Sequence, residues 1–152
     1  MSNREEYYTF NEYMKGNSLT PSEEDYVEMI YRLSLNSEII KVSDVSRALN
    51  IKPPSVTKMI KKLDGKNILI YRRYESVELT EVGKIIGQRL LYRHNVIQKF
   101  LKIIGVKNYV HEETEKIEHT ISIETLVKID EFIGFIDRNE DILGRFREYQ
   151  SE

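Results

Sequence analysis

The sequence predicts a mainly α-helical protein with two parts: an N-terminal winged helix-turn-helix domain with a small β-hairpin wing, and a C-terminal, all-helical dimerisation domain. The first part is indicated by two short helical patterns, the second of them basic, followed by two β-like segments around a tight turn. The second part is indicated by helical patterns with strong apolar faces after residue 80. We expect domains at residues 20–80 and 81–152, preceded by a loosely packed N-terminal arm at residues 1–19.

The composition of the 152-residue chain is typical of a soluble globular protein, with 40% hydrophobic and 32% charged residues. The absence of cysteine excludes disulfide frameworks, thiolate zinc sites and cysteine nucleophiles. No apolar run approaches the roughly 18 residues that a membrane span needs, and the N-terminus lacks a basic-then-apolar signal pattern. We therefore expect a cytoplasmic protein with no membrane partner.

Helix boundaries in the N-terminal part follow from capping residues. Thr20, Pro21 and Glu23 have the spacing of a capping box and predict a helix to about Ser34. A second helix, with a serine cap, is expected over residues 42–49, and a third begins at the Pro53-Pro54 pair. Residues 67–74 and 76–79 are predicted to form the two strands of the wing.

The C-terminal part is expected to open with a long helix, capped by Thr80-Glu81 and ended near Ile104 by Gly105. Three more helices are expected near residues 111–121, 123–136 and 139–149. The second of them has an apolar face that its own segment is too short to bury, so a partner subunit is the expected cover. This face consists of Ile129, Phe132, Ile133 and Ile136.

Charge is distributed unevenly along the chain. Between Lys41 and Glu75 there are nine basic and three acidic residues, whereas between His111 and Glu152 there are twelve acidic and five basic. A basic block in an otherwise acidic protein indicates a face that binds a polyanion. On charge alone, a solvated helix face would explain the block as well; its position in a helix-turn-helix favours double-stranded DNA.

The third helix of this part is the expected DNA-reading element. Its first turns would meet base edges in the major groove, with Pro54 and Val56 against thymine methyl groups, while its later lysines and the arginines of the wing would contact phosphates. The candidate DNA-binding residues are Pro54, Ser55, Val56, Thr57, Lys58, Lys61, Lys62, Arg72 and Arg73.

Residue types that bind metals occur on three of the predicted helices. Taken singly, each has an ordinary explanation: Asp25 and Glu115 lie near helix starts, where carboxylates stabilise the dipole, His94 lies on an apolar stripe, and Glu118-His119 could face solvent. Taken together, four carboxylates and two imidazoles suit one or two divalent ions of intermediate hardness. The candidate metal ligands are Asp25, Glu28, His94, Glu115, Glu118 and His119.

Four sequence segments resemble the manganese-responsive, short-chain branch of the diphtheria toxin repressor family. They are residues 20–28, 55–59, 91–94 and 115–119, and the resemblance covers about residues 20–140. The resemblance implies that the six candidates form a binuclear site for two Mn²⁺ ions per subunit. It also implies a homodimer that binds a pseudo-palindromic operator and represses metal-uptake genes when manganese is plentiful.

Iron-responsive members of that family carry a methionine and a cysteine at the positions of Asp25 and Glu115. Both are hard oxygen donors here, which favours Mn²⁺. Two other interpretations stay open at this point. One is a winged-helix regulator that answers another signal, either another divalent metal such as Fe²⁺ or a small organic ligand. The other is a metallohydrolase, which we do not favour because no separate general base or oxyanion donor is evident and the basic helix would go unexplained. We expect a regulator and not an enzyme.

Overall fold

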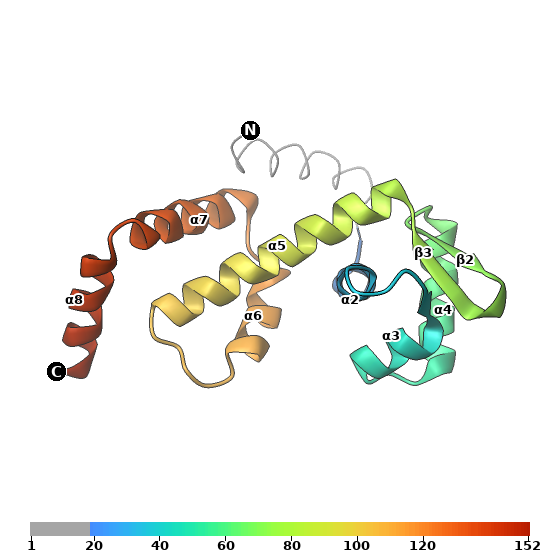
Figure 1. The fold of residues 1–152 in the computed structure, drawn as a ribbon, viewed down its shortest axis with the longest axis horizontal. Helices are drawn as coiled ribbons and strands as arrows, with labels where there is room; N and C mark the ends of the chain where they lie inside the picture. Colours follow the sequence, from blue (N-terminus) through green and yellow to red (C-terminus); the bar gives the residue numbers. More distant parts are fainter. Residues whose placement is uncertain (1–18) are drawn as a thin grey trace. The chain divides into compact units, whose positions relative to one another are not determined.

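The structure, a computed structural model, describes residues 19–152, so the predicted arm at residues 1–19 lies almost wholly outside the described residues. The chain forms two compact units that divide within one long helix, between Leu91 and Tyr92. Figure 1 shows the elements of both units. Among the described residues, no helix has both the length and the apolar character that crossing a membrane requires.

The N-terminal unit contains three helices, a small sheet and the first half of the long helix α5. In chain order these elements are α2 (Pro21–Ser34), β1 (Ile40–Lys41), α3 (Val42–Leu49), α4 (Pro53–Gly65), β2 (Leu69–Arg72), a 3-10 turn (Arg73–Glu75), β3 (Ser76–Leu79) and α5 (Glu81–Ile103).

Two threonine caps fix helix starts as predicted. The Glu23 backbone N–H donates to Thr20 Oγ1 and the Thr20 N–H donates to Glu23 Oε1, both at 3.2 Å, which completes a capping box. At α5, Thr80 Oγ1 accepts from Gly83 N–H at 3.0 Å. The predicted serine cap of α3 is wrong: the helix begins at Val42, and the Asp44 carboxylate caps it by accepting the Lys41 N–H at 2.8 Å. A carboxylate accepts more strongly than a hydroxyl because it is charged.

The sheet has the antiparallel order β1-β3-β2. The predicted hairpin is present, with Ile70 opposite Glu78 and Arg72 opposite Ser76. Strand β1, in which Ile40 pairs with Val77, was not predicted, since two residues are too short to show a period. With the hairpin, α3 and α4 make this unit a winged helix, so the predicted fold class is confirmed.

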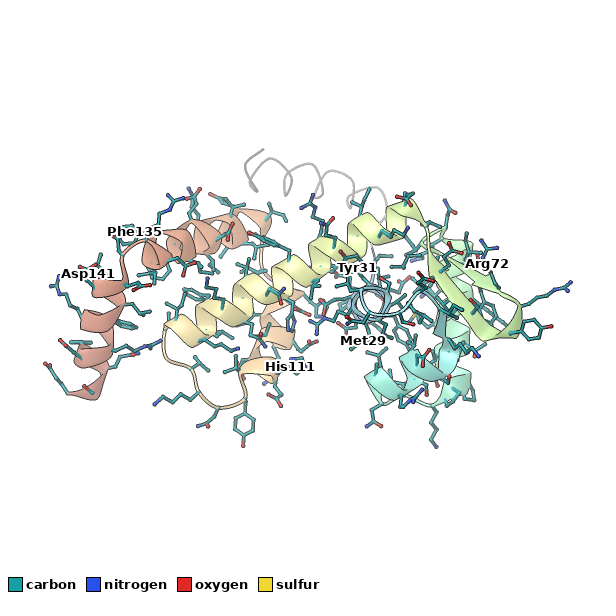
Figure 2. All side chains as sticks on the ribbon, viewed as in Figure 1. Met29, Tyr31, Arg72, His111, Phe135 and Asp141 are labelled. Atoms are coloured by element: carbon teal, nitrogen blue, oxygen red, sulfur yellow. The ribbon has the colours of Figure 1, made fainter. Side chains whose placement is uncertain are left out.

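Apolar side chains from every helix of the N-terminal unit and from its hairpin form one core. At the contact between α2 and α5, a Cβ added to Gly87 would lie 2.5 Å from Tyr31 Cβ, so only glycine permits this approach. Tyr31 is labelled on α2 in Figure 2. The fully buried members of the core are Val27, Ile30, Val45, Val56, Ile60, Leu63, Leu69 and Ile86.

The C-terminal unit contains the second half of α5 and three further helices, namely α6 (Val110–Glu118), α7 (Ile123–Asp137) and α8 (Glu140–Ser151). Two polar contacts join α5 to α7: Tyr92 Oη donates to Asp130 at 2.8 Å, and Lys99 lies 2.6 Å from Asp137. Its core consists of Val96, Ile97, Leu101, Ile103, Leu126, Val127, Ile133 and Ile136.

The apolar face predicted on α7 is only partly buried in the part of the chain that the structure describes. Ile133 and Ile136 are buried, whereas Phe132, Phe135 and, on α8, Phe146 remain exposed. Phe135 is labelled near the end of α7 in Figure 2. Neighbouring exposed aromatic side chains are typical of a surface that a partner covers.

Candidate metal centre and DNA-binding face

A buried histidine and a buried glutamate lie at the centre of the polar cluster in the C-terminal unit. His94 on α5 and Glu118 on α6 are 2% and 1% exposed. His94 Nδ1 lies 2.9 Å from Glu118 Oε2, within hydrogen-bond distance. Two titratable groups buried against each other indicate a site rather than a solvated surface, since polar groups in an interior need defined partners.

The Glu118 carboxylate faces two imidazoles with different oxygens. Oε2 is directed to His94, and Oε1 lies 3.6 Å from Nε2 of His119, which follows α6 directly. A carboxylate with an imidazole beside each of its oxygens provides donor atoms that would suit a divalent metal. The i,i+3 and i,i+4 spacing of Glu118 and His119 from Glu115 places Glu115 on the same side of α6 as these two residues.

Glu115 extends the cluster by one helical turn. Its Oε1 lies 3.6 Å from His94 Nδ1. One ligand atom from each of Glu115, Glu118 and His119 lies within 4.8 Å of the others, and the same holds for His94, Glu115 and Glu118. The structure therefore brings all four candidate ligands of the C-terminal unit together.

His111 is a member of this cluster that sequence reasoning missed. Its Nε2 lies 3.7 Å from Glu115 Oε1, and its ring centroid is 5.5 Å from that of His94. Figure 2 shows it near the start of α6. The i,i+4 spacing from His111 to Glu115 was the available signal, although an exposed histidine at a helix start is unremarkable by itself.

The chemistry of this donor set fits a divalent metal of intermediate hardness. Carboxylate oxygens and imidazole nitrogens in mixture suit first-row divalent ions, and thiolates, which softer metals prefer, are absent from the chain. A metal-free hydrogen-bond network would also satisfy the His94–Glu118 pair. It would not require a second imidazole at the other oxygen of Glu118.

The two remaining candidate ligands lie on α2, in the N-terminal unit. Asp25 and Glu28 are three positions apart and share a helix face. Glu28 also forms an ion pair with Arg32, one turn further on, at 2.8 Å. That these two carboxylates join the ligands of the other unit stays a prediction.

Helix α4 presents most of its candidate DNA contacts to solvent. Pro54, Ser55, Lys58, Lys61 and Lys62 are exposed, and Thr57 is half-buried. Val56 has no exposed surface and packs in the core. We therefore remove Val56 from the proposed base contacts, because the hydrophobic period of the helix turns it inward.

The wing carries both candidate arginines. Arg72 on β2 and Arg73 in the turn are exposed, and the guanidinium of Arg72 pairs with Glu78 across the hairpin at 3.0 Å. Figure 2 shows Arg72 on the wing. The next residue, Tyr74, adopts φ 61° and is 90% exposed, so the turn projects its ring into solvent.

The chain combines a winged helix, which has an exposed basic recognition helix, with a helical unit that holds a cluster of carboxylates and imidazoles. This combination is typical of metal-responsive DNA-binding regulators. The chain belongs to the iron-dependent repressor family. Residues 18–77 match the model described as "Iron dependent repressor, N-terminal DNA binding domain". Residues 80–145 match the model described as "Iron dependent repressor, metal binding and dimerisation domain".

Two relatives are similar over most of the chain. It is 42% identical to the HTH-type transcriptional regulator MntR of Shouchella clausii (strain KSM-K16) over 132 residues, which are 86% of this chain and 92% of the relative. It is 40% identical to the protein of the same name from Geobacillus kaustophilus (strain HTA426), covering 86% and 94%. The solved structure of the manganese regulator SloR is 30% identical, with a TM-score of 0.67.

The match to SloR covers 77% of this chain, which spans only about half, 55%, of that solved structure. Family membership confirms the predictions of a DNA-binding transcriptional regulator that is not an enzyme, that binds a divalent metal and that assembles as a homodimer on operator DNA.

Proposed function

We propose that this protein is a manganese-dependent repressor of metal-uptake genes, activated when two Mn²⁺ ions bind per subunit. The observation that supports it most directly is the Glu118 carboxylate, whose two oxygens face the imidazoles of His94 and His119. The full proposed ligand set is Asp25, Glu28, His94, Glu115, Glu118 and His119.

The choice of manganese rests on the ligand atoms and on the relatives. Four of the six proposed ligands are carboxylates and none contains sulfur, which suits a hard divalent ion. Two similar proteins are named MntR, and SloR is described as a manganese regulator. Because Mn²⁺ is the weakest binder of the first-row divalent series, geometry and ligand number must supply the selectivity.

The proposed ligands explain how metal would control DNA binding. Asp25 and Glu28 belong to the N-terminal unit, and the other four belong to the C-terminal unit. Four carboxylates gathered without a cation repel one another. Neutralising them would restrict the motion of one unit against the other and favour conformations in which the two recognition helices of a dimer fit successive major grooves, about 34 Å apart. A pseudo-palindromic operator follows from such a dimer, and we propose a cytoplasmic location for it.

A DNA-binding titration across divalent metals tests the proposal. At one fixed salt concentration, Mn²⁺ should raise operator affinity more than Mg²⁺ or Ca²⁺ does, and a chelator should reverse the effect. The salt must be fixed because phosphate contacts make affinity salt-dependent. Calorimetry should give two Mn²⁺ per subunit. Activation by Fe²⁺ but not by Mn²⁺ would instead indicate an iron sensor, and indifference to every metal would indicate a regulator that answers an organic ligand.

A further inference from the structure

Glu23 is a fully buried carboxylate that neither the metal site nor the DNA contacts use. Its capping-box hydrogen bonds with Thr20 involve only the first turn of α2 and do not require burial. Transferring an ionised carboxylate from water carries a large desolvation cost unless opposite charge and hydrogen bonds compensate it. The burial of Glu23 therefore calls for an explanation beyond the helix cap.

Two lysines at the end of the recognition helix provide the opposite charge. Lys66 Nζ lies 2.7 Å from Glu23 Oε2, and Lys62 Nζ lies 3.8 Å from Oε1. Through these two contacts Glu23 joins the first turn of α2 to the C-terminal end of α4.

The two helices joined in this way carry the two halves of the proposed function. Asp25 and Glu28 follow Glu23 by two and five positions on α2. Helix α4 presents its DNA contacts from its first turns, and its 13 residues form a short, stiff rod. Holding the last turn of such a rod also determines where its first turn points.

We propose that Glu23 is a positioning residue that transmits a shift of α2 to the recognition helix through its ion pair with Lys66. The inference rests on the proposed metal-dependent function and extends it to a residue outside both binding sites. The ion pairs of Glu23 with Lys62 and Lys66 have a second consequence. They make the charge of these lysines less available to DNA phosphates.

Glu23→Gln separates this role from a merely structural one. The substitution keeps the shape and the helix cap, and it removes the charge. We expect the Mn²⁺-induced increase in operator affinity to fall by roughly five- to tenfold, at the low end of allosteric couplings. Metal-free affinity for non-specific DNA should stay the same or rise, because two lysines lose their buried counter-charge. A structural defect would instead lower both affinities together.

The matched control is Glu81→Gln, which removes the same charge from an exposed pair with Lys84 in the same unit. It should leave the metal response unchanged. The double variant Glu23→Gln/Lys66→Gln removes both charges of the close pair and should show the same reduced response as Glu23→Gln alone. If the single variant does not fold, the double variant carries the test.

Three outcomes separate the hypotheses. A reduced metal response with intact non-specific binding supports the coupling role. A full response in Glu23→Gln, or an equal fall in both affinities, overturns it and leaves the proposed function standing. A wild-type protein that does not respond to Mn²⁺ refutes the proposed function and the coupling with it.

Discussion

Helices α4 and α6 both carry charged side chains that are proposed to bind a ligand. The charges of α4 are exposed to solvent, whereas the central charge of α6 is buried. On α4 the lysines Lys58 and Lys61 are exposed, and among the described residues neither takes part in an ion pair. On α6 the Glu118 carboxylate is buried and lies against two imidazoles. Exposed charges attract a polyanion over a Debye length, and each contributes little. Buried charges are screened less by salt, so each interacts more strongly with its neighbours.

The largest expected effect on metal binding comes from replacing the buried carboxylate of α6. Glu118→Gln should lower Mn²⁺ affinity by more than roughly a hundredfold, beyond the 10- to 100-fold that losing an outer partner of a metal ligand costs. Metal-stimulated operator binding should disappear while circular dichroism shows a folded protein. Glu113→Gln on the same helix, which removes an exposed partner of Lys116, should change neither quantity. Unaltered manganese dependence in Glu118→Gln would remove this carboxylate from the site.

A smaller effect is expected at the rim of the cluster. His111 is largely exposed but lies 3.7 Å from Glu115. His111→Gln should lower Mn²⁺ affinity by about tenfold, the low end for loss of an outer partner. Calorimetry of the metal-binding reaction would measure it. A loss as large as that of Glu118→Gln would make His111 a direct ligand, and no change would make it a surface residue.

The smallest effect is expected from replacing one exposed lysine of α4, and it concerns DNA affinity. Lys58→Gln should lower affinity for every DNA sequence by about fivefold near 0.15 M salt and reduce the salt slope by about one, the signature of one lost phosphate contact. The factor by which Mn²⁺ raises affinity should not change. Lys84→Gln, on α5 of the same unit, is the control. A loss confined to the operator sequence would show instead that Lys58 reads a base.

Most of the fold could be predicted because its signals are local. Capping residues, one proline pair and the hydrophobic period predicted the starts of α2, α4 and α5 to within one residue of their observed positions. The two-residue strand β1 and the Asp44 cap escaped prediction because they depend on a neighbouring strand and on a competition between acceptors. Val56 shows the same limit: its residue type fits a thymine methyl contact, and only the packed core shows that it faces inward.

By itself, the sequence determined the fold class, the basic character of α4 and the residue types available for a metal, since these follow from composition and periodicity along the chain. Only the tertiary structure decided which oxygen of Glu118 faces which imidazole, that His111 joins Glu115, and that Glu23 is buried against Lys66. The physical reason is that hydrogen bonds and close ion pairs need their atoms within roughly 3 to 4 Å of each other. Residues as far apart in sequence as Glu23 and Lys66 meet only after the helices have packed.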